Sequence, residues 1–209
     1  MLASISPVGE AGRGQRWTIT VTAFTIASTA AGAAVGGAVG LIGAWLAGAP
    51  PVGAWSPAIA AAVLAALAVV GASVDAGRLP LTVPSWQRQV DERWLTSFRG
   101  WVYGAGYGAQ LGAAVLTVVP TAATYVAFGA ALLVAGVSGQ ALAAVAIGAT
   151  FGLGRALPVL ATARWRDPER LRTSFGRFDA RRTRVAAATV AGQLVVAAGA
   201  VTLVPFVVS

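Results

Sequence analysis

The chain contains no cysteine, no histidine and no lysine among its 209 residues. Without cysteine it can form no disulfide bond and can carry no electrons by dithiol exchange. Without cysteine and histidine it also lacks the thiolate and imidazole groups of most zinc sites, haem sites and nucleophile–base pairs. The sequence therefore predicts a protein that is not an enzyme and that holds no cofactor and no metal.

Charged residues are also scarce. They make up only 11% of the chain, against about 25% in an ordinary soluble domain. Residues 17–74, 100–154 and 185–209 contain no Asp, Glu, Lys, Arg or His. A helix needs about 20 apolar residues to cross a bilayer, so each of the first two runs is long enough for two spans. The runs do not alternate as strands of a membrane barrel do. We therefore predict an all-α, polytopic transmembrane helical bundle.

The apolar runs divide into spans at glycine and proline. The full-length spans are expected at about residues 17–46, 57–74, 141–163 and 185–207. Pro120 interrupts the stretch 101–137, because proline lacks an N–H and clashes with the preceding helical turn. We expect this stretch to cross once as a broken element, which gives about five crossings built from five to six helices. Two full spans, or a re-entrant piece near Pro120, are the alternatives.

The charges that remain are mostly Arg, which gives a net charge of +8. Apart from Arg155, the Arg residues lie in three regions between or before the apolar runs, at residues 1–16, 76–99 and 164–184. Cytoplasmic loops of membrane proteins are enriched in such residues, which favours this interpretation over nucleic-acid binding. We predict one transmembrane domain over residues 1–209 of a bacterial, multi-pass cell-membrane protein. Its N-terminus, residues 1–16, is cytoplasmic, its first span is retained and its C-terminus lies outside.

Two connecting segments have predicted surface roles. Residues 164–184 form an Arg-rich cytoplasmic loop that contacts anionic lipid headgroups of the bilayer or docks a protein partner. Residues 79–100 place aromatic side chains at helical intervals, with charges on the other faces, which predicts an amphipathic helix in the membrane interface. A solvated connector packed under the spans is the alternative. The proposed interface residues are Trp86, Trp94, Phe98 and Trp101.

Glycines recur at every fourth position in two places. One ladder consists of Gly32, Gly36 and Gly40, and the other consists of Gly104, Gly108 and Gly112. Small residues at this spacing let two helices approach closely, so we assign both ladders to helix packing. Each ladder is followed by a proline break and an Ala-rich span, which is the pattern of a degenerate two-half repeat.

The second ladder and the Pro120-Thr121 pair resemble the transmembrane thiol–disulfide interchange family, of the DsbD-like, cytochrome c biogenesis type, and related small exporters. In that family the first helix of each half is glycine-rich and meets a Pro-Cys break. Here Thr121 stands where cysteine is expected, and the first half has no clean match. The resemblance covers residues 100–160. It implies a shared fold in a cysteine-less form, without the family's redox activity.

Two features are candidates for substrate binding. Arg155 is a charge inside an apolar segment, where charged groups are costly and usually functional. It would bind an anionic substrate or pair with a partner protein, unless its long side chain reaches the headgroups. The second feature is a polar cavity at the helix break, for which local hydroxyl groups that satisfy a kinked backbone are the alternative. The candidate lining residues are Pro120, Thr117, Thr121, Thr124 and Gln110.

Two functions fit these features. The first is a transporter-like protein that moves a small, anionic solute and assembles as a homo-oligomer. The second is a non-catalytic accessory or assembly subunit of a larger membrane protein complex, in which the glycine faces dock partner helices. The acidic residues lie outside the apolar runs, so we expect no carboxylate within a span to carry protons.

Overall fold

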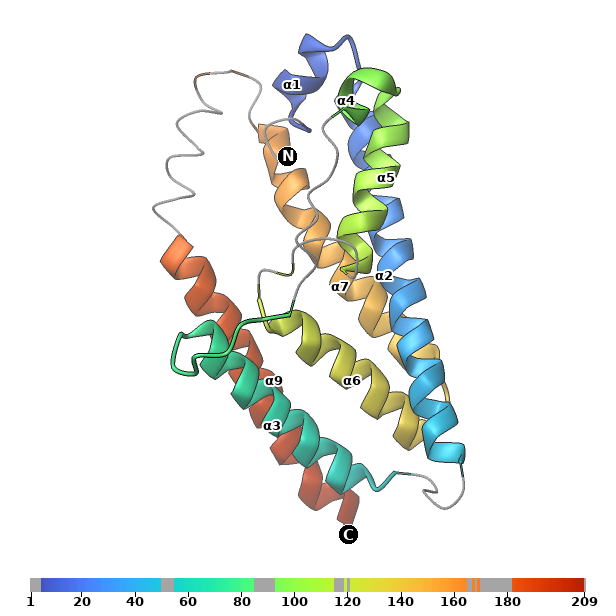
Figure 1. Ribbon diagram of the computed structural model, residues 1–209, viewed down its shortest axis with the longest axis vertical. Helices are drawn as coiled ribbons and strands as arrows, with labels where there is room; N and C mark the ends of the chain where they lie inside the picture. Colours follow the sequence, from blue (N-terminus) through green and yellow to red (C-terminus); the bar gives the residue numbers. More distant parts are fainter. Residues whose placement is uncertain are drawn as a thin grey trace. The chain divides into compact units, whose positions relative to one another are not determined.

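The computed structural model describes residues 5–49, 55–84, 93–114, 119, 121–164, 167, 169 and 182–208. All regular secondary structure in these residues is helical, which confirms the predicted all-α helical bundle (Figure 1). The elements are α1 (Pro7–Gly12), α2 (Trp17–Gly48), α3 (Pro57–Asp75), α4 (Trp94–Ser97), α5 (Gly100–Ala113), α6 (Ala123–Ser138), α7 (Leu142–Ala161), the 3-10 turn η1 (Thr162–Arg164) and α9 (Arg182–Val208).

Within the described residues, four helices are long and apolar enough to cross a membrane. They are α2, α3, the stretch Leu142–Arg164 that contains α7, and the stretch Thr183–Thr202 of α9. The bounds of the first three lie within two residues of the predicted spans, and α9 as a whole contains the predicted span 185–207. Length and apolar composition therefore suffice to locate these helices. Helix α6 is also apolar but shorter.

The predicted interruption of the stretch 101–137 is confirmed. Helix α5 ends at Ala113 and α6 begins at Ala123. Ala114 ends α5 with a φ of 56°, a left-handed conformation that residues with a Cβ adopt only at a cost. Pro120 lies outside the described residues, as does Thr117. That this stretch crosses the membrane once stays a prediction.

The amphipathic helix predicted within residues 79–100 is interrupted in its described part. From Arg93 onward, α4 covers only Trp94–Ser97. Phe98 and Arg99 have extended backbones, so Trp101 belongs to α5 and not to the same helix as Trp94. Trp86 lies outside the described residues.

Packing against α5 accounts for this difference. The Trp94 ring stacks on Tyr107 with centroids 5.9 Å apart, and a Cβ on Gly106 would collide with it. The contact turns Trp94 toward a neighbouring helix, which half-buries it. The aromatic spacing therefore reports tertiary packing at this position, and not one face of a continuous helix.

The chain forms two compact units. Unit 1 comprises Met1–Gly32, Trp86–Val118 and Ala149–Arg182, and unit 2 comprises Ala33–Ser85, Val119–Gly148 and Thr183–Ser209. Helices α2 and α7 contribute residues to both units.

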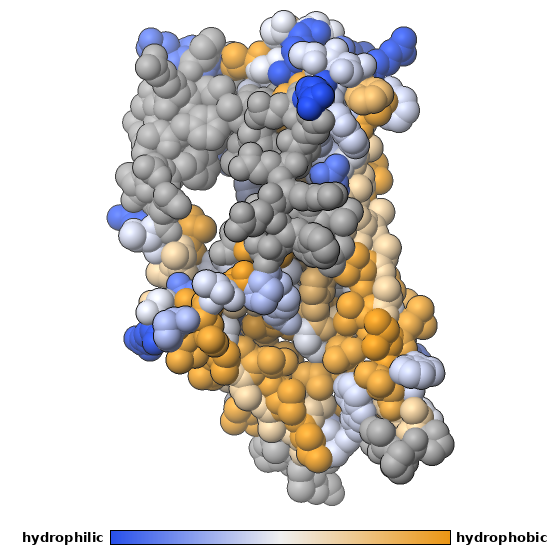
Figure 2. Space-filling model, viewed as in Figure 1, coloured by the Kyte–Doolittle hydropathy of each residue, from blue (hydrophilic) through white to orange (hydrophobic). Residues whose placement is uncertain are grey.

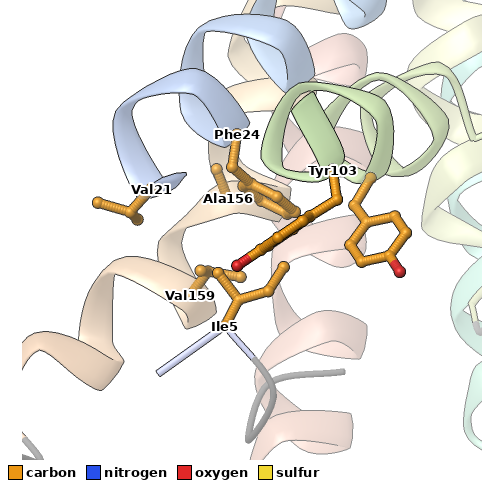
Figure 3. Packing of buried hydrophobic residues seen from close by; sticks show 7 residues of the cluster. Ile5, Val21, Phe24, Tyr103, Ala156 and Val159 are labelled. Carbon is orange, nitrogen blue, oxygen red and sulfur yellow. The ribbon is translucent and has the colours of Figure 1, made fainter. Parts of the chain in front are cut away.

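Unit 1 is built on the second glycine ladder. Cβ atoms on Gly104, Gly108 and Gly112 would collide with the backbone of α2 at Thr20, Phe24 and Ser28, respectively. Both sets of residues are spaced by four, so one face of α5 lies against one face of α2 over two helical turns. The predicted packing role of this ladder is confirmed. The apolar core of unit 1 comprises Ile5, Val21, Phe24, Tyr103, Tyr107, Ala156 and Val159, six of which are labelled in Figure 3.

Unit 2 contains the end of the first ladder. A Cβ on Gly36 would collide with the backbone of α7 at Ala144 and Gly148, and one on Gly40 with the Ala144 side chain. Gly32, the ladder's first residue, is buried. A small cluster of Ala68, Val126 and Ala197 joins α3, α6 and α9. Small residues thus bring these helices close together in unit 2 as well.

Candidate functional site

A buried carboxylate lies near the beginning of the chain, in unit 1. Ser6 accepts a hydrogen bond from Gly9 N (3.1 Å) and so caps α1, which places Glu10 one turn into the helix. The Glu10 side chain is 0% exposed. Its oxygens accept hydrogen bonds from Arg13 (2.5 Å) and Thr20 (2.6 Å), and the Tyr103 hydroxyl lies 2.6 Å from both of them.

This Glu10 cluster connects three helices. Glu10 and Arg13 come from α1 and its end, Thr20 from the first turn of α2, and Tyr103 from the first turn of α5. Figure 3 shows the Tyr103 ring lying among Phe24, Val159 and Ile5. The cluster therefore fixes the start of the chain to the helix pair that the glycine ladder forms.

The charge of Glu10 is neutralised locally. Burial lowers the pKa of Arg13, but the hydrogen bonds that it makes with Glu10 and Tyr103 outweigh this effect and raise its pKa above the usual value. The guanidinium also lies 5.7 Å from the Tyr103 ring centroid. Arg13 therefore stays cationic beside the carboxylate, and the cluster is an internal ion pair in which both carboxylate oxygens accept hydrogen bonds.

A second carboxylate lies in unit 2, where α3, α6 and α9 meet. Asp75 is the last residue of α3. Its Oδ1 accepts a hydrogen bond from Ala122 N (2.8 Å), and its Oδ2 accepts one from Gln193 Nε2 (2.6 Å). Gln193 is 4% exposed, and its Oε1 has no hydrogen-bond partner in the described part of the chain.

The position of Asp75 follows from the helix break. The first N–H groups of a helix have no partner within it, and a carboxylate at this end is favoured by the helix dipole. Asp75 supplies that group from α3 to the residue that precedes α6. Gln193 comes from within the span Thr183–Thr202, where the side chains around it are mostly Ala, Val and Leu. The Asp75–Gln193 pair is thus a polar contact between apolar helices.

Arg155, the predicted anion-binding residue, is half-buried in α7. Its guanidinium lies 5.5 Å from the Phe151 ring centroid, a cation–π contact. Among the described residues, no carboxylate forms an ion pair with it. Its predicted role in binding an anionic substrate stays a prediction.

The described residues among those predicted to line a cavity belong to both units. Gln110 is a half-buried residue of α5 in unit 1. Thr121 and Thr124 lie at the start of α6 in unit 2, and Thr124 is buried. The structure therefore places the two threonines near the Asp75 contact to Ala122, while the cavity itself stays a prediction.

Sequence reasoning missed Glu10, Asp75 and Gln193. It assigned the acidic residues to loops, whereas Glu10 is buried in α1 and Asp75 belongs to α3. One signal was available, because Gln193 is the sole side-chain amide in the last apolar run, and a polar side chain there requires a partner. Within the described ranges, no group of three or more His, Cys, Asp or Glu residues gathers to hold a metal ion.

Comparisons with known proteins give one informative match. No family model matches the chain, and no solved structure matches it. Over 99 residues it is 43% identical to the methylamine utilization protein MauF of Paracoccus versutus. That match covers 46% of this chain and 35% of the relative, so the chain spans about a third of the length of the curated protein it matches. The resemblance to the thiol–disulfide interchange family stays a prediction.

Proposed function

We propose that the chain is a membrane-embedded accessory protein of a system that uses small amines. The observation that carries this proposal is the 43% identity over 99 residues to a methylamine utilization protein. Four apolar helices of spanning length support the membrane location.

The surface of the helices also supports association within a membrane. In each of the four spans, 28% or less of the apolar window is buried. Large apolar side chains such as Trp45, Leu142 and Val195 are exposed, and Figure 2 shows apolar surface along the visible helices. Such surface is stable only when lipid or partner helices cover it.

Deletion of the gene in the source organism tests the proposal. We expect the deletion strain to grow normally on a non-amine substrate and to grow poorly, or not at all, with methylamine as the sole source of carbon or nitrogen. An accessory role further requires that uptake of labelled methylammonium by whole cells is kept while amine oxidation by cell fractions is lost. Normal growth of the deletion strain on methylamine would refute the proposal.

Transport is a second candidate, favoured by the interrupted pair α5 and α6 with a polar contact at the break. In this case the protein reconstituted alone in liposomes takes up a small solute. For an anionic solute, uptake is expected to be lost in Arg155→Ala and kept in Arg164→Ala, because Arg164 is exposed at the end of the span. Equal uptake by both variants, or no uptake, contradicts the role of Arg155.

A further inference from the structure

We propose that Asp75 and Gln193 form a binding site for a small ammonium-type cation, such as a primary alkylammonium ion. The site follows from the contacts of these two side chains, whereas the choice of an alkylammonium ligand rests on the proposed function. This inference differs from the Arg155 prediction in both the place and the charge of the ligand.

The first argument is charge. Asp75 is half-buried at the end of α3, and its carboxylate meets a backbone N–H and a neutral amide. In the portion of the chain that the structure describes, no Arg forms an ion pair with it. A partly buried carboxylate without a cationic partner gains a charge-assisted hydrogen bond when it binds a cation. A bound cation would supply this missing charge.

The second argument is the unmade hydrogen bond of Gln193. Its Nε2 donates to Asp75 Oδ2, which leaves Oε1 buried without a donor. Buried acceptors are rarely left in this state, because an unmade hydrogen bond costs free energy. The site therefore requires a positive charge at Asp75 and an N–H donor at Gln193.

An ammonium group supplies both. One N–H would donate to the Asp75 carboxylate beside the Gln193 amide, and another would donate to Gln193 Oε1. Divalent metal cations fit less well, because they take about six or more oxygen ligands.

Gly71 of α3 lies directly against the Gln193 amide. A Cβ at Gly71 would lie 2.9 Å from Gln193 Oε1 and 3.0 Å from Val126 Cγ2, with Ala122 Cβ at 3.5 Å. A side chain at Gly71 would therefore press on the Gln193 amide. This close packing restricts the size of any group bound beside Gln193.

Calorimetric titration of the purified protein in detergent micelles tests the site. Methylammonium is expected to bind, while tetramethylammonium, which carries the charge without an N–H, is expected to bind at least tenfold more weakly. Asp75→Asn and Gln193→Met are each expected to weaken methylammonium binding at least tenfold. Thr189→Val is the matched control on the same helix, because Thr189 bonds only to its own helix at Val185 O, and this variant should bind normally.

Three results would overturn the site. They are no heat of binding with the wild-type protein, equal binding of methylammonium and tetramethylammonium, and full binding by both Asp75→Asn and Gln193→Met. Size-exclusion profiles identify any variant that fails to fold, and Gly71→Ala, which should weaken binding without removing a polar group, then replaces it. Failure of binding together with a methylamine growth defect refutes the site alone, whereas binding without a growth defect refutes the proposed function alone.

Discussion

The two units each contain a carboxylate between helices, but the partners of the two carboxylates differ. Glu10 is fully buried, and its carboxylate contacts the Arg13 guanidinium and the hydroxyl groups of Thr20 and Tyr103. Asp75 has a backbone N–H and an amide whose oxygen is left without a donor. The first arrangement pairs the carboxylate with a cation inside the protein and serves stability. The second lacks a positive charge and a hydrogen-bond donor, both of which a bound ammonium ion would supply.

Removal of Glu10 should have the largest effect. Glu10→Ala leaves Arg13, Tyr103 and Thr20 without their common acceptor, so we expect a loss of about 2–4 kcal/mol of stability. Thermal unfolding in detergent, followed by circular dichroism, measures this loss. Arg16→Ala, which removes an exposed charge nearby, is the control. A Glu10→Ala protein as stable as the control would show that the Glu10 cluster contributes nothing to stability.

Tyr103→Phe should have an intermediate effect. The substitution keeps the ring in its core but removes the hydroxyl that lies 2.6 Å from both Glu10 oxygens. We expect a loss of about 1–2 kcal/mol, because a hydrogen bond to a charged group is lost. Tyr125→Phe is the comparison on the same unfolding assay, because it removes an exposed hydroxyl that donates to the Pro84 carbonyl and not to a charged group. Equal stability of the two variants would contradict the role assigned to the Tyr103 hydroxyl.

Asp75→Asn should have the smallest effect and sharpens the comparison most. The new amide oxygen can accept from Ala122 N, and its nitrogen can donate to Gln193 Oε1 once the Gln193 amide rotates. The substitution removes an unpaired charge and satisfies a buried acceptor, so we expect stability to change by less than about 1 kcal/mol in either direction. A Glu10→Gln protein measured beside it should lose more stability than Asp75→Asn. The reverse order would remove the distinction between the two carboxylates.

Sequence reasoning located what depends on local composition. The spans follow from long runs without charge, and the packing of Gly104, Gly108 and Gly112 follows from their spacing. The polar clusters do not follow, because Glu10 and Tyr103 are 93 residues apart and Asp75 and Gln193 are 118 apart. No local pattern connects such residues. The helix predicted through Trp94 and Phe98 was wrong for the same reason, since a ring contact with α5 overrode the aromatic periodicity.

The register between α5 and α2 has a mechanical consequence. Glycines at every fourth position of α5 contact the backbone of α2 at every fourth position. The two helices therefore pack closely in one register. Sliding by a fraction of a turn would drive side chains into backbone, and the next matching position lies about 6 Å away along the axis. The pair therefore resists small axial shifts, and any displacement of α5 along α2 has to occur in whole steps of one turn.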